Sequence, residues 1–229
     1  MGSADTEARA VDKLVKKMRR DWDQRARENH RHYIVNSRTE WSDEDFARSG
    51  EATLSHYVLT DMGNVCRGKS PDAMRVLDFG CGAGRVTRAM ARVFGEVHGV
   101  DISPEMVGLA QAQVGCLPNV HIHLYNGVDL DVLGNLMFDF AFSFSVFHHV
   151  PGKGLIENCV REVGKHLLPG ALFKFEVQGA PFVPPPDDTW LGPSLTEADV
   201  KSIADRCGFE ARFSIGAGEE SYWQWLFKR

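Results

Sequence analysis

The chain has 229 residues, of which 43% are hydrophobic and 25% charged, and its formal net charge is −5 at pH 7. This balance is typical of a globular protein with a packed core and excludes fibrous and disordered classes. Because so small a net charge supplies no positive field for a nucleic-acid backbone or an anionic membrane, we expect a small-molecule partner rather than either of these.

The cysteine pattern and the first residues of the chain indicate the cellular compartment of the protein. The cysteines show no C-x-x-C pair, which argues against a disulfide framework and a zinc site and fits a reducing compartment. No apolar run of a signal peptide opens the chain, and no stretch approaches the roughly 18 apolar residues of a membrane helix. We therefore predict a soluble, cytoplasmic protein without a bound metal; the sequence leaves its oligomeric state open.

The first 70 residues have mostly helical patterns. Apolar residues recur at spacings of three and four within residues 6–32, which predicts an amphipathic helix. Ser42 followed by Asp45 is typical of a capped helix start, and a third helical pattern covers residues 56–65. We predict that residues 1–70 form a helical appendage or lid and residues 71–229 the main domain.

From residue 73 onward, short β-branched or aromatic runs alternate with helical segments, which indicates β-α-β units and a parallel sheet. The predicted strands are residues 75–79, 96–101, 120–125, 138–145 and 171–177. Ser103 followed by Pro104 predicts the start of one helix. The apolar face from Leu155 to Leu167 predicts another, ended by Pro169-Gly170.

The last fifty residues begin with a loop. Five prolines in residues 179–193 predict an extended loop without regular structure. A helix is expected over residues 194–207 and an antiparallel pair of strands over residues 210–215 and 222–228. The expected fold class is α/β: a doubly wound, mostly parallel seven-stranded sheet with a final antiparallel strand, Rossmann-like, plus the helical appendage.

A glycine-rich turn follows the first predicted strand in the sequence VLDFGCGAGRVT, residues 76–87. A dinucleotide site favours G-x-G-x-x-G, which places a pyrophosphate at a helix N-terminus, whereas the spacing here is G-x-G-x-G. Asp78, just before the turn, would repel a pyrophosphate and attract an ammonium group. The pattern therefore predicts a ligand with a positive end.

A second acidic residue, Asp101, ends the next predicted strand 21 residues after Gly80. A carboxylate at this place can accept hydrogen bonds from both hydroxyls of a ribose. The two motifs together predict recognition of an adenosine-containing ligand.

The stretches DFGCGAG and GVDISPEM resemble motif I and its sequel in class I S-adenosylmethionine-dependent methyltransferases. The similarity runs from about residue 74 to 229. It implies an enzyme that transfers a methyl group from its cofactor, S-adenosyl-L-methionine, to an oxygen or nitrogen of a small molecule. The implied cofactor-binding residues are Asp78, Gly80, Cys81, Gly82, Asp101, Ile102, Met106, Asn126, Gly127, Val128, Ser143 and Phe144.

The resemblance also implies which part of the cofactor these residues contact. The glycine-rich turn would face the methionine part, Asp101 the ribose, and Ile102 and Met106 the adenine. Gly127 and Val128 would flank the adenine edge, although many relatives have an acidic residue directly after Asn126. Ser143 and Phe144 would contact the amino-acid end.

Two histidine pairs are candidates for chemistry. His148 and His149 follow the fourth predicted strand, where a neutral imidazole can take a proton from an acceptor, and the resemblance favours His149. Positioning or packing is the alternative for both. His121 and His123 share one strand face, but no cysteine or carboxylate cluster lies nearby in the sequence, so we interpret them as packing residues.

Aromatic residues are candidates for the wall and closure of the pocket. We expect Phe182, Trp190 and Trp223 to contribute to the acceptor wall. Trp22 and Tyr33 are interpreted as packing residues of the appendage, with a lid over the cofactor as the alternative.

Two other functions remain. A nicotinamide-dependent oxidoreductase is disfavoured by the glycine spacing and by the closing antiparallel strands. A protein that binds S-adenosylmethionine without catalysis has the same motifs and stays open.

Overall fold

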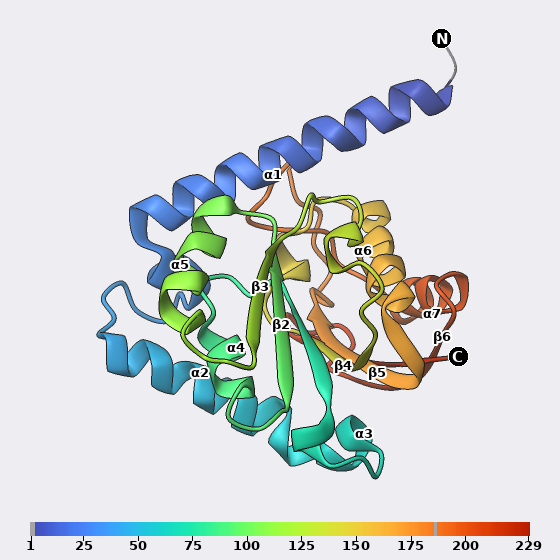
Figure 1. The fold of residues 1–229 in the computed structure, drawn as a ribbon. Coiled ribbons are helices and arrows are strands. Elements are labelled where there is room, and N and C mark those ends of the chain that lie inside the picture. The colour runs from blue at the N-terminus through green and yellow to red at the C-terminus, as the bar shows by residue number, and fades with distance from the viewer. Residues whose placement is uncertain (1–2, 186) are drawn as a thin grey trace.

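A seven-stranded sheet forms the centre of the computed structural model, which describes residues 3–185 and 187–229 (Figure 1). The strand order is β3-β2-β1-β4-β5-β7-β6, and β7 alone runs antiparallel to its neighbours. The strands are β1 (Arg75–Phe79), β2 (Glu96–Asp101), β3 (Val120–Leu124), β4 (Phe138–Ser143), β5 (Leu167–Val177), β6 (Phe209–Ile215) and β7 (Tyr222–Lys228). The predicted fold class is confirmed.

Helices cover both faces of the sheet. Figure 1 shows α4 and α5 on one face, with α2 beside α4, and α6 and α7 on the other. The helices are α1 (Ser3–Ile34), α2 (Asp43–Tyr57), α3 (Met62–Cys66), α4 (Arg85–Met90), α5 (Pro104–Val114), α6 (Lys153–Lys165) and α7 (Glu197–Arg206). Ser42 and Ser103 cap α2 and α5 as expected, each accepting a hydrogen bond from a backbone N–H of the first turn.

Successive side chains of a strand point to opposite faces of the sheet, so the strands contribute to two hydrophobic cores. In β1, Val76 points into the core beneath α4 and α5, whereas Leu77 and Phe79 point into the core beneath α6 and α7. In β5, Leu172 and Phe173 divide in the same way. Because β1, β4 and the later part of β5 are buried on both faces, they read as almost continuous apolar runs, as central parallel strands do.

Helix α1 lies across one end of the sheet, over the carboxyl ends of the parallel strands (Figure 1). Arg19 donates hydrogen bonds to the backbone oxygens of Ile102 and Tyr125 at 3.1 and 3.2 Å. The helix is interrupted at Asn29, which has an extended backbone and whose side chain accepts from the backbone N–H of His32. This residue starts a separate last turn.

Two of the predicted helices have different bounds in the structure. No single helix covers residues 56–65: α2 ends at Tyr57 and α3 begins at Met62. The buried ammonium of Lys174 donates to the backbone oxygen of Tyr57 at 2.6 Å and takes an acceptor that a continuing helix would use. Residues 194–207 are helical only from Glu197, because Thr196 and Asp199 form the capping box.

The expected end of the helix before β5 is also wrong. Leu167, Pro169 and Gly170 belong to β5, and α6 ends at Lys165. The pairing of β5 with β4 shifts register in this part of the strand, and Gly170 has a φ of 80° there. Proline and glycine are tolerated at such an irregularity, where the hydrogen-bond ladder is broken.

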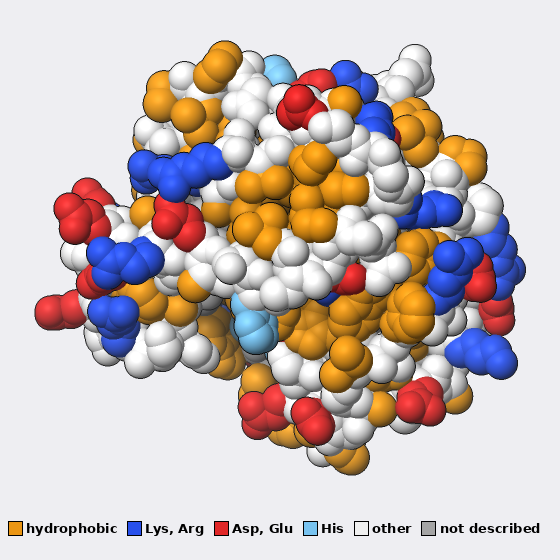
Figure 2. All heavy atoms as spheres, turned by 90° about the horizontal axis from the view of Figure 1, so that it is seen from below, with side chains coloured by type: hydrophobic (Ala, Val, Ile, Leu, Met, Phe, Trp, Pro, Cys, Tyr) orange, Lys and Arg blue, Asp and Glu red, His pale blue; other side chains and the backbone are white. Residues whose placement is uncertain are grey.

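The surface opposite α1 is seen in Figure 2, which shows lysine and arginine side chains interspersed with aspartate and glutamate around patches of hydrophobic side chains. This face has no broad area of one charge. Among the described residues, no helix is both long and apolar enough to cross a membrane.

Candidate active site

A cavity opens at the carboxyl ends of β1, β2 and β4, beneath α1. It encloses about 940 Å³ of empty space, part of it open to solvent. Its lining includes these residues that the sequence predicted: Asp78, Gly80, Cys81, Gly82, Asp101, Ile102, Met106, Phe144 and His149. The switch point of a doubly wound sheet is the expected place for a ligand.

The glycine-rich turn forms the floor of the cavity. The backbone N–H groups of Gly80 and Cys81 both donate to the carbonyl of Val100 at 2.8 and 3.0 Å, which ties the turn to β2. Gly80 has a φ of 77°, and a Cβ atom there would lie 2.3 Å from the side chain of Val146. Only glycine combines this backbone conformation with this close approach.

Asp101 lies at the end of β2, between the turn and α5. Its Oδ2 accepts from the backbone N–H of Gly82 and its Oδ1 from that of Ser103, both at 2.9 Å. Burial raises the pKa of this carboxyl to about 6, and these hydrogen bonds oppose the shift. Each carboxylate oxygen has two lone pairs, so the group retains acceptors for a ligand.

Asp78 is the second carboxyl of the cavity and is almost fully buried. The Thr87 hydroxyl donates to its Oδ2 at 2.6 Å. Burial raises its pKa to about 6, and the positive charge of Arg85 opposes the shift. A cationic ligand would favour the ionised form of this group.

Arg85 brings a buried positive charge to the same cavity and was not predicted. It opens α4, and its guanidinium donates to the Thr53 hydroxyl of α2 at 2.9 Å. Burial lowers its pKa to about 10. Within the described part of the chain its Nε is buried without a hydrogen-bond partner, and the residue lines the cavity.

His149 lies in the wall of the cavity after β4. Its Nδ1 lies 2.6 Å from the carbonyl oxygen of Trp190, so Nδ1 carries the proton and Nε2 has a lone pair. Burial lowers its pKa to about 4, so the ring is neutral at pH 7. Trp22 contacts it edge-on, with ring centroids 5.0 Å apart.

Polar and aromatic contacts join α1 to the loop of residues 179–193. Arg25 donates to the backbone oxygen and the hydroxyl of Thr189 at 3.0 and 3.1 Å, and that hydroxyl donates to Asp21 at 2.8 Å. The guanidinium carbon of Arg25 also lies over the rings of Trp22 and Trp190, at 4.9 and 5.2 Å from their centroids. These contacts place α1 and the loop together at one side of the cavity, and Trp22 and Tyr33 line it.

The sequence and structural comparisons agree with this geometry. A family model described as a methyltransferase domain matches residues 76–170. A dTDP-3-amino-3,6-dideoxy-alpha-D-glucopyranose N,N-dimethyltransferase from Streptomyces fradiae is 26% identical over 132 residues, 58% of this chain and 50% of that protein. A ubiquinone biosynthesis O-methyltransferase from Xanthomonas oryzae pv. oryzae is 32% identical over 98 residues, 42% of this chain and 39% of that protein.

The fold matches along most of the chain. Magnesium protoporphyrin IX methyltransferase from Synechocystis PCC 6803 with bound SAM superposes with a TM-score of 0.67 and 18% identity, over 94% of this chain and 97% of that chain. An amino pentose methyltransferase from Micromonospora echinaspora, also with bound SAM, gives a TM-score of 0.63 and 19% identity over 84% and 99%.

Residues 76–170 therefore match a methyltransferase domain, and the chain as a whole has the fold of solved S-adenosylmethionine-dependent methyltransferases. Both of these solved structures contain bound SAM. The chain thus spans about half or less of the length of these two curated relatives.

Several residues that the resemblance implied lie outside the lining of the cavity. Asn126 closes its own loop by accepting from the backbone N–H groups of Val128 and Asp129. Gly127 is covered by Val15 of α1, whose Cγ1 would lie 2.4 Å from an added Cβ. Ser143 donates to the backbone oxygen of Phe79 at 2.8 Å. Their cofactor contacts, and that of the exposed Val128, stay predictions.

Other predicted residues are displaced from the cavity as well. His148 does not line it, and its Nε2 is buried without a hydrogen-bond partner among the described residues. The expected wall residues Phe182, Trp190 and Trp223 also lie outside the lining; Trp223 stacks on Tyr57 instead. Helix α1 supplies Met18 and Trp22 to the wall, and Trp22 had a place over the cofactor as the alternative interpretation.

Proposed function

We propose that this protein transfers a methyl group from S-adenosylmethionine to an oxygen or nitrogen of a small, partly apolar acceptor. One observation carries the proposal: a cavity at the switch point of a methyltransferase fold joins two buried carboxyl groups, a buried guanidinium and a neutral imidazole. Each of these groups has a counterpart in the chemistry of this cofactor.

The charged groups of the cavity fit the polar parts of the cofactor. Asp101 would accept hydrogen bonds from the ribose hydroxyls, and Asp78 would hold the ammonium group directly or through water. Arg85 would attract the carboxylate of the methionine part, since this positively charged residue lines the cavity. Ile102 and Met106 supply apolar contact for the adenine.

The bound cofactor supplies an electrophilic methyl group on a sulfonium. The protein then orients the acceptor in line with that methyl and excludes water. Trp22 and Met18 of α1 supply apolar wall for this exclusion. A dry cavity helps because positive charge is lost from the sulfonium as the methyl is transferred.

His149 would accept the hydrogen of the attacking hydroxyl or amine at Nε2. The pKa of about 4 makes this imidazole a weak base for an unreacted hydroxyl. An oxygen or nitrogen that has begun to bond to the methyl becomes far more acidic, so a weak base suffices late in the step. His149 therefore positions the acceptor first and takes its proton afterwards.

The relatives support a small-molecule acceptor without identifying it. One is named for an amino sugar and another for ubiquinone biosynthesis. We propose no nucleic-acid or membrane partner. The five free cysteines support a reducing, cytoplasmic location.

Binding and turnover experiments test the proposal. Isothermal titration with S-adenosylmethionine, S-adenosylhomocysteine and NADH should give binding to the first two only. Transfer of a labelled methyl group to a panel of hydroxyl and amine acceptors should then give turnover with at least one member. Binding of NADH alone would establish the oxidoreductase alternative, and cofactor binding without turnover across the panel would favour a non-catalytic binding protein.

A further inference from the structure

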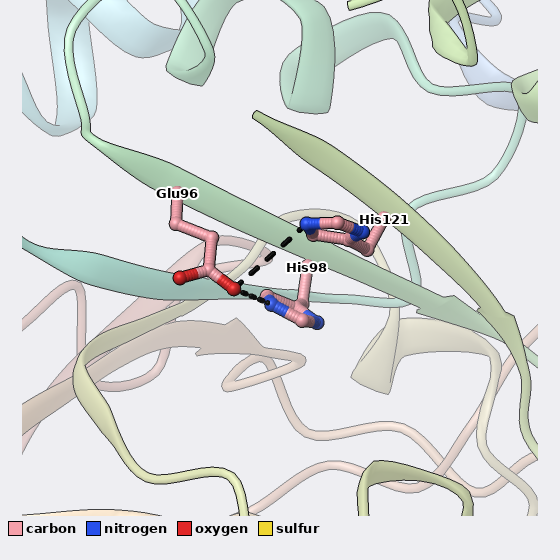
Figure 3. Close-up of side chains that lie close together, drawn as sticks. All are labelled: Glu96, His98 and His121. Atoms are coloured by element: carbon pink, nitrogen blue, oxygen red, sulfur yellow. Dashed lines mark hydrogen bonds and ion pairs between the residues drawn. The ribbon is translucent and has the colours of Figure 1, made fainter. Parts of the chain in front are cut away.

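Three potential metal ligands meet on the strands β2 and β3, at the end of the sheet away from the cavity. Figure 3 shows Glu96, His98 and His121 pointing toward one another from these two strands. His98 and His121 are paired in the parallel register, so their side chains leave the same face of the sheet. Glu96 lies two residues before His98 and therefore shares that face.

The ligand atoms are close enough to share one ion. Oε1 of Glu96 lies 2.7 Å from Nε2 of His98 and 3.8 Å from Nε2 of His121. All three atoms lie within 4.8 Å of one another. An ion with bonds of about 2.0–2.2 Å to nitrogen and oxygen fits between atoms at such separations after small side-chain rotations.

A fourth residue holds His98 in place. Nδ1 of His98 lies 2.9 Å from Nε2 of His123, and the two ring planes are nearly parallel, with an interplanar angle of 4°. When Nε2 of His98 binds an ion, its Nδ1 carries the proton and donates it to His123. Histidine ligands of metals nearly always donate their other N–H to such an acceptor.

The surroundings favour neutral imidazoles. Burial lowers the pKa of His98, against the opposing effect of Glu96, and burial lowers the pKa of His123 to about 4. The neutral ring is the form that binds metal ions. Arg75 pairs with Oε2 of Glu96 at 2.8 Å, which leaves Oε1 toward the histidines but places one positive charge beside the group.

We propose that Glu96, His98 and His121 form a binding site for a divalent transition-metal ion, with His123 as a positioning residue. Two imidazole nitrogens and one carboxylate oxygen, with a position left for water, suit Zn²⁺. The His121 side chain is 47% exposed and gives the ion access, whereas that of His98 is 4% exposed.

The place of the site indicates a structural role. Glu96 begins β2 and Asp101, which lines the cavity, ends it, so these two residues are roughly 16 Å apart and His98 is roughly 10 Å from Asp101, at about 3.3 Å per residue. β3 is an edge strand, and within the described residues only a short helical turn, Asp131–Leu133, follows it before β4. An ion bound here would tie this edge strand to β2 and would take no part in methyl transfer.

Metal titration tests the site. Untagged full-length protein, first treated with chelator, is titrated with Zn²⁺ by calorimetry and with Co²⁺ by absorption. We expect one ion per chain, an elevated melting temperature with Zn²⁺, and a Co²⁺ spectrum of nitrogen and oxygen ligands without thiolate bands. His121→Ala and Glu96→Gln should weaken binding by about tenfold or more, whereas His56→Ala, at an exposed histidine of α2, should bind as the wild type does.

Two further measurements distinguish a positioning role of His123 from a contribution to folding alone. His123→Leu should weaken Zn²⁺ binding by about 10- to 100-fold, and His123→Gln, which restores an acceptor, should recover part of the loss. Affinity for S-adenosylmethionine should be the same with and without Zn²⁺. Absence of binding by the wild type, wild-type affinity in a folded His121→Ala variant, or thiolate bands with Co²⁺ would overturn the proposal.

Discussion

At the scale of single residues, Asp101 links the glycine-rich turn to α5 and keeps lone pairs toward the cavity. Asp101→Ala should weaken S-adenosylmethionine binding by about 1–3 kcal/mol, because the ribose hydroxyls lose a buried acceptor. Calorimetric titration measures the loss, and a melting curve shows whether the turn still folds. Unchanged affinity in a folded variant would refute the assignment.

His149 and His148 are adjacent in sequence but differ in their surroundings. His149→Ala should lower kcat by about 10²–10⁴-fold with little change in cofactor affinity, since the loss concerns proton transfer and acceptor position. His148→Ala should have a much smaller effect on kcat, because His148 does not line the cavity. Steady-state kinetics with a common acceptor measures kcat for both variants. Equal losses of kcat would contradict a specific role of His149 in proton transfer.

The site residues that the sequence could predict are those fixed by local patterns. Asp78 and Asp101 each end a buried strand, so their place at the switch point follows from the strand alone. Arg85 was missed because its burial depends on the packing of α2 against α4. His98 and Glu96 were missed as partners of His121 because the parallel register of two strands brings them together, and no short-range spacing shows it.

At the scale of elements, the crossing of α2 and α4 depends on Gly50. A Cβ atom at this position would lie 2.3 Å from the backbone oxygen of Arg85. Gly50→Ala should therefore destabilise the protein by about 1–3 kcal/mol, because a backbone contact cannot move as a flexible side chain does.

Urea denaturation measures this change, with Gly63→Ala as the control. Gly63 lies in α3, and an added Cβ there has no atom within 4 Å. Its substitution should leave the free energy of unfolding unchanged or slightly raised. Equal effects of the two substitutions would show that the helix crossing tolerates the extra methyl group.

Strands were predicted closely because burial on both faces and turn residues mark them in the sequence. Helix bounds failed where a distant residue competes for the backbone: Lys174, far along the chain in β5, takes the carbonyl of Tyr57. The extension of β5 through Pro169 depends on a register shift against β4, which no local propensity encodes.

At the scale of the whole molecule, buried carboxyl groups and buried histidines have opposite effects on how stability changes with pH in the acidic range. Asp78 and Asp101 have a pKa raised to about 6, so they hold protons in the folded state that the unfolded chain has lost, and stability falls as the pH rises from about 4 to 6. His149 and His123 have a pKa lowered to about 4, so their contribution to stability rises over a similar range.

Asp101→Asn should expose this balance. The variant lacks the Asp101 carboxyl, whose contribution to stability falls as the pH rises. Its free energy of unfolding should therefore rise more steeply than that of the wild type between about pH 4 and 6.5. Urea denaturation of both proteins without cofactor, at fixed ionic strength, measures the two slopes. Parallel curves would contradict the assigned pKa of Asp101.

The sheet order of the whole molecule could be expected from the family resemblance, but the place of α1 could not. The amphipathic pattern shows that this helix has an apolar face, and only the structure shows that the face lies over the strand ends and contributes Met18 and Trp22 to the cavity. The separation of residues 1–70 from the main domain stays a prediction, since Leu54, Val58 and Val65 pack into the core beneath α4.

Two thiols, Cys81 and Cys159, line the cavity in which we place an alkylating cofactor. Burial raises the pKa of the Cys159 thiol to about 12 and that of Cys81 well above its usual value. Because the thiolate is the nucleophile, both sulfur atoms stay in their unreactive protonated form at neutral pH. Desolvation thus protects the protein from self-alkylation while it holds the methyl donor.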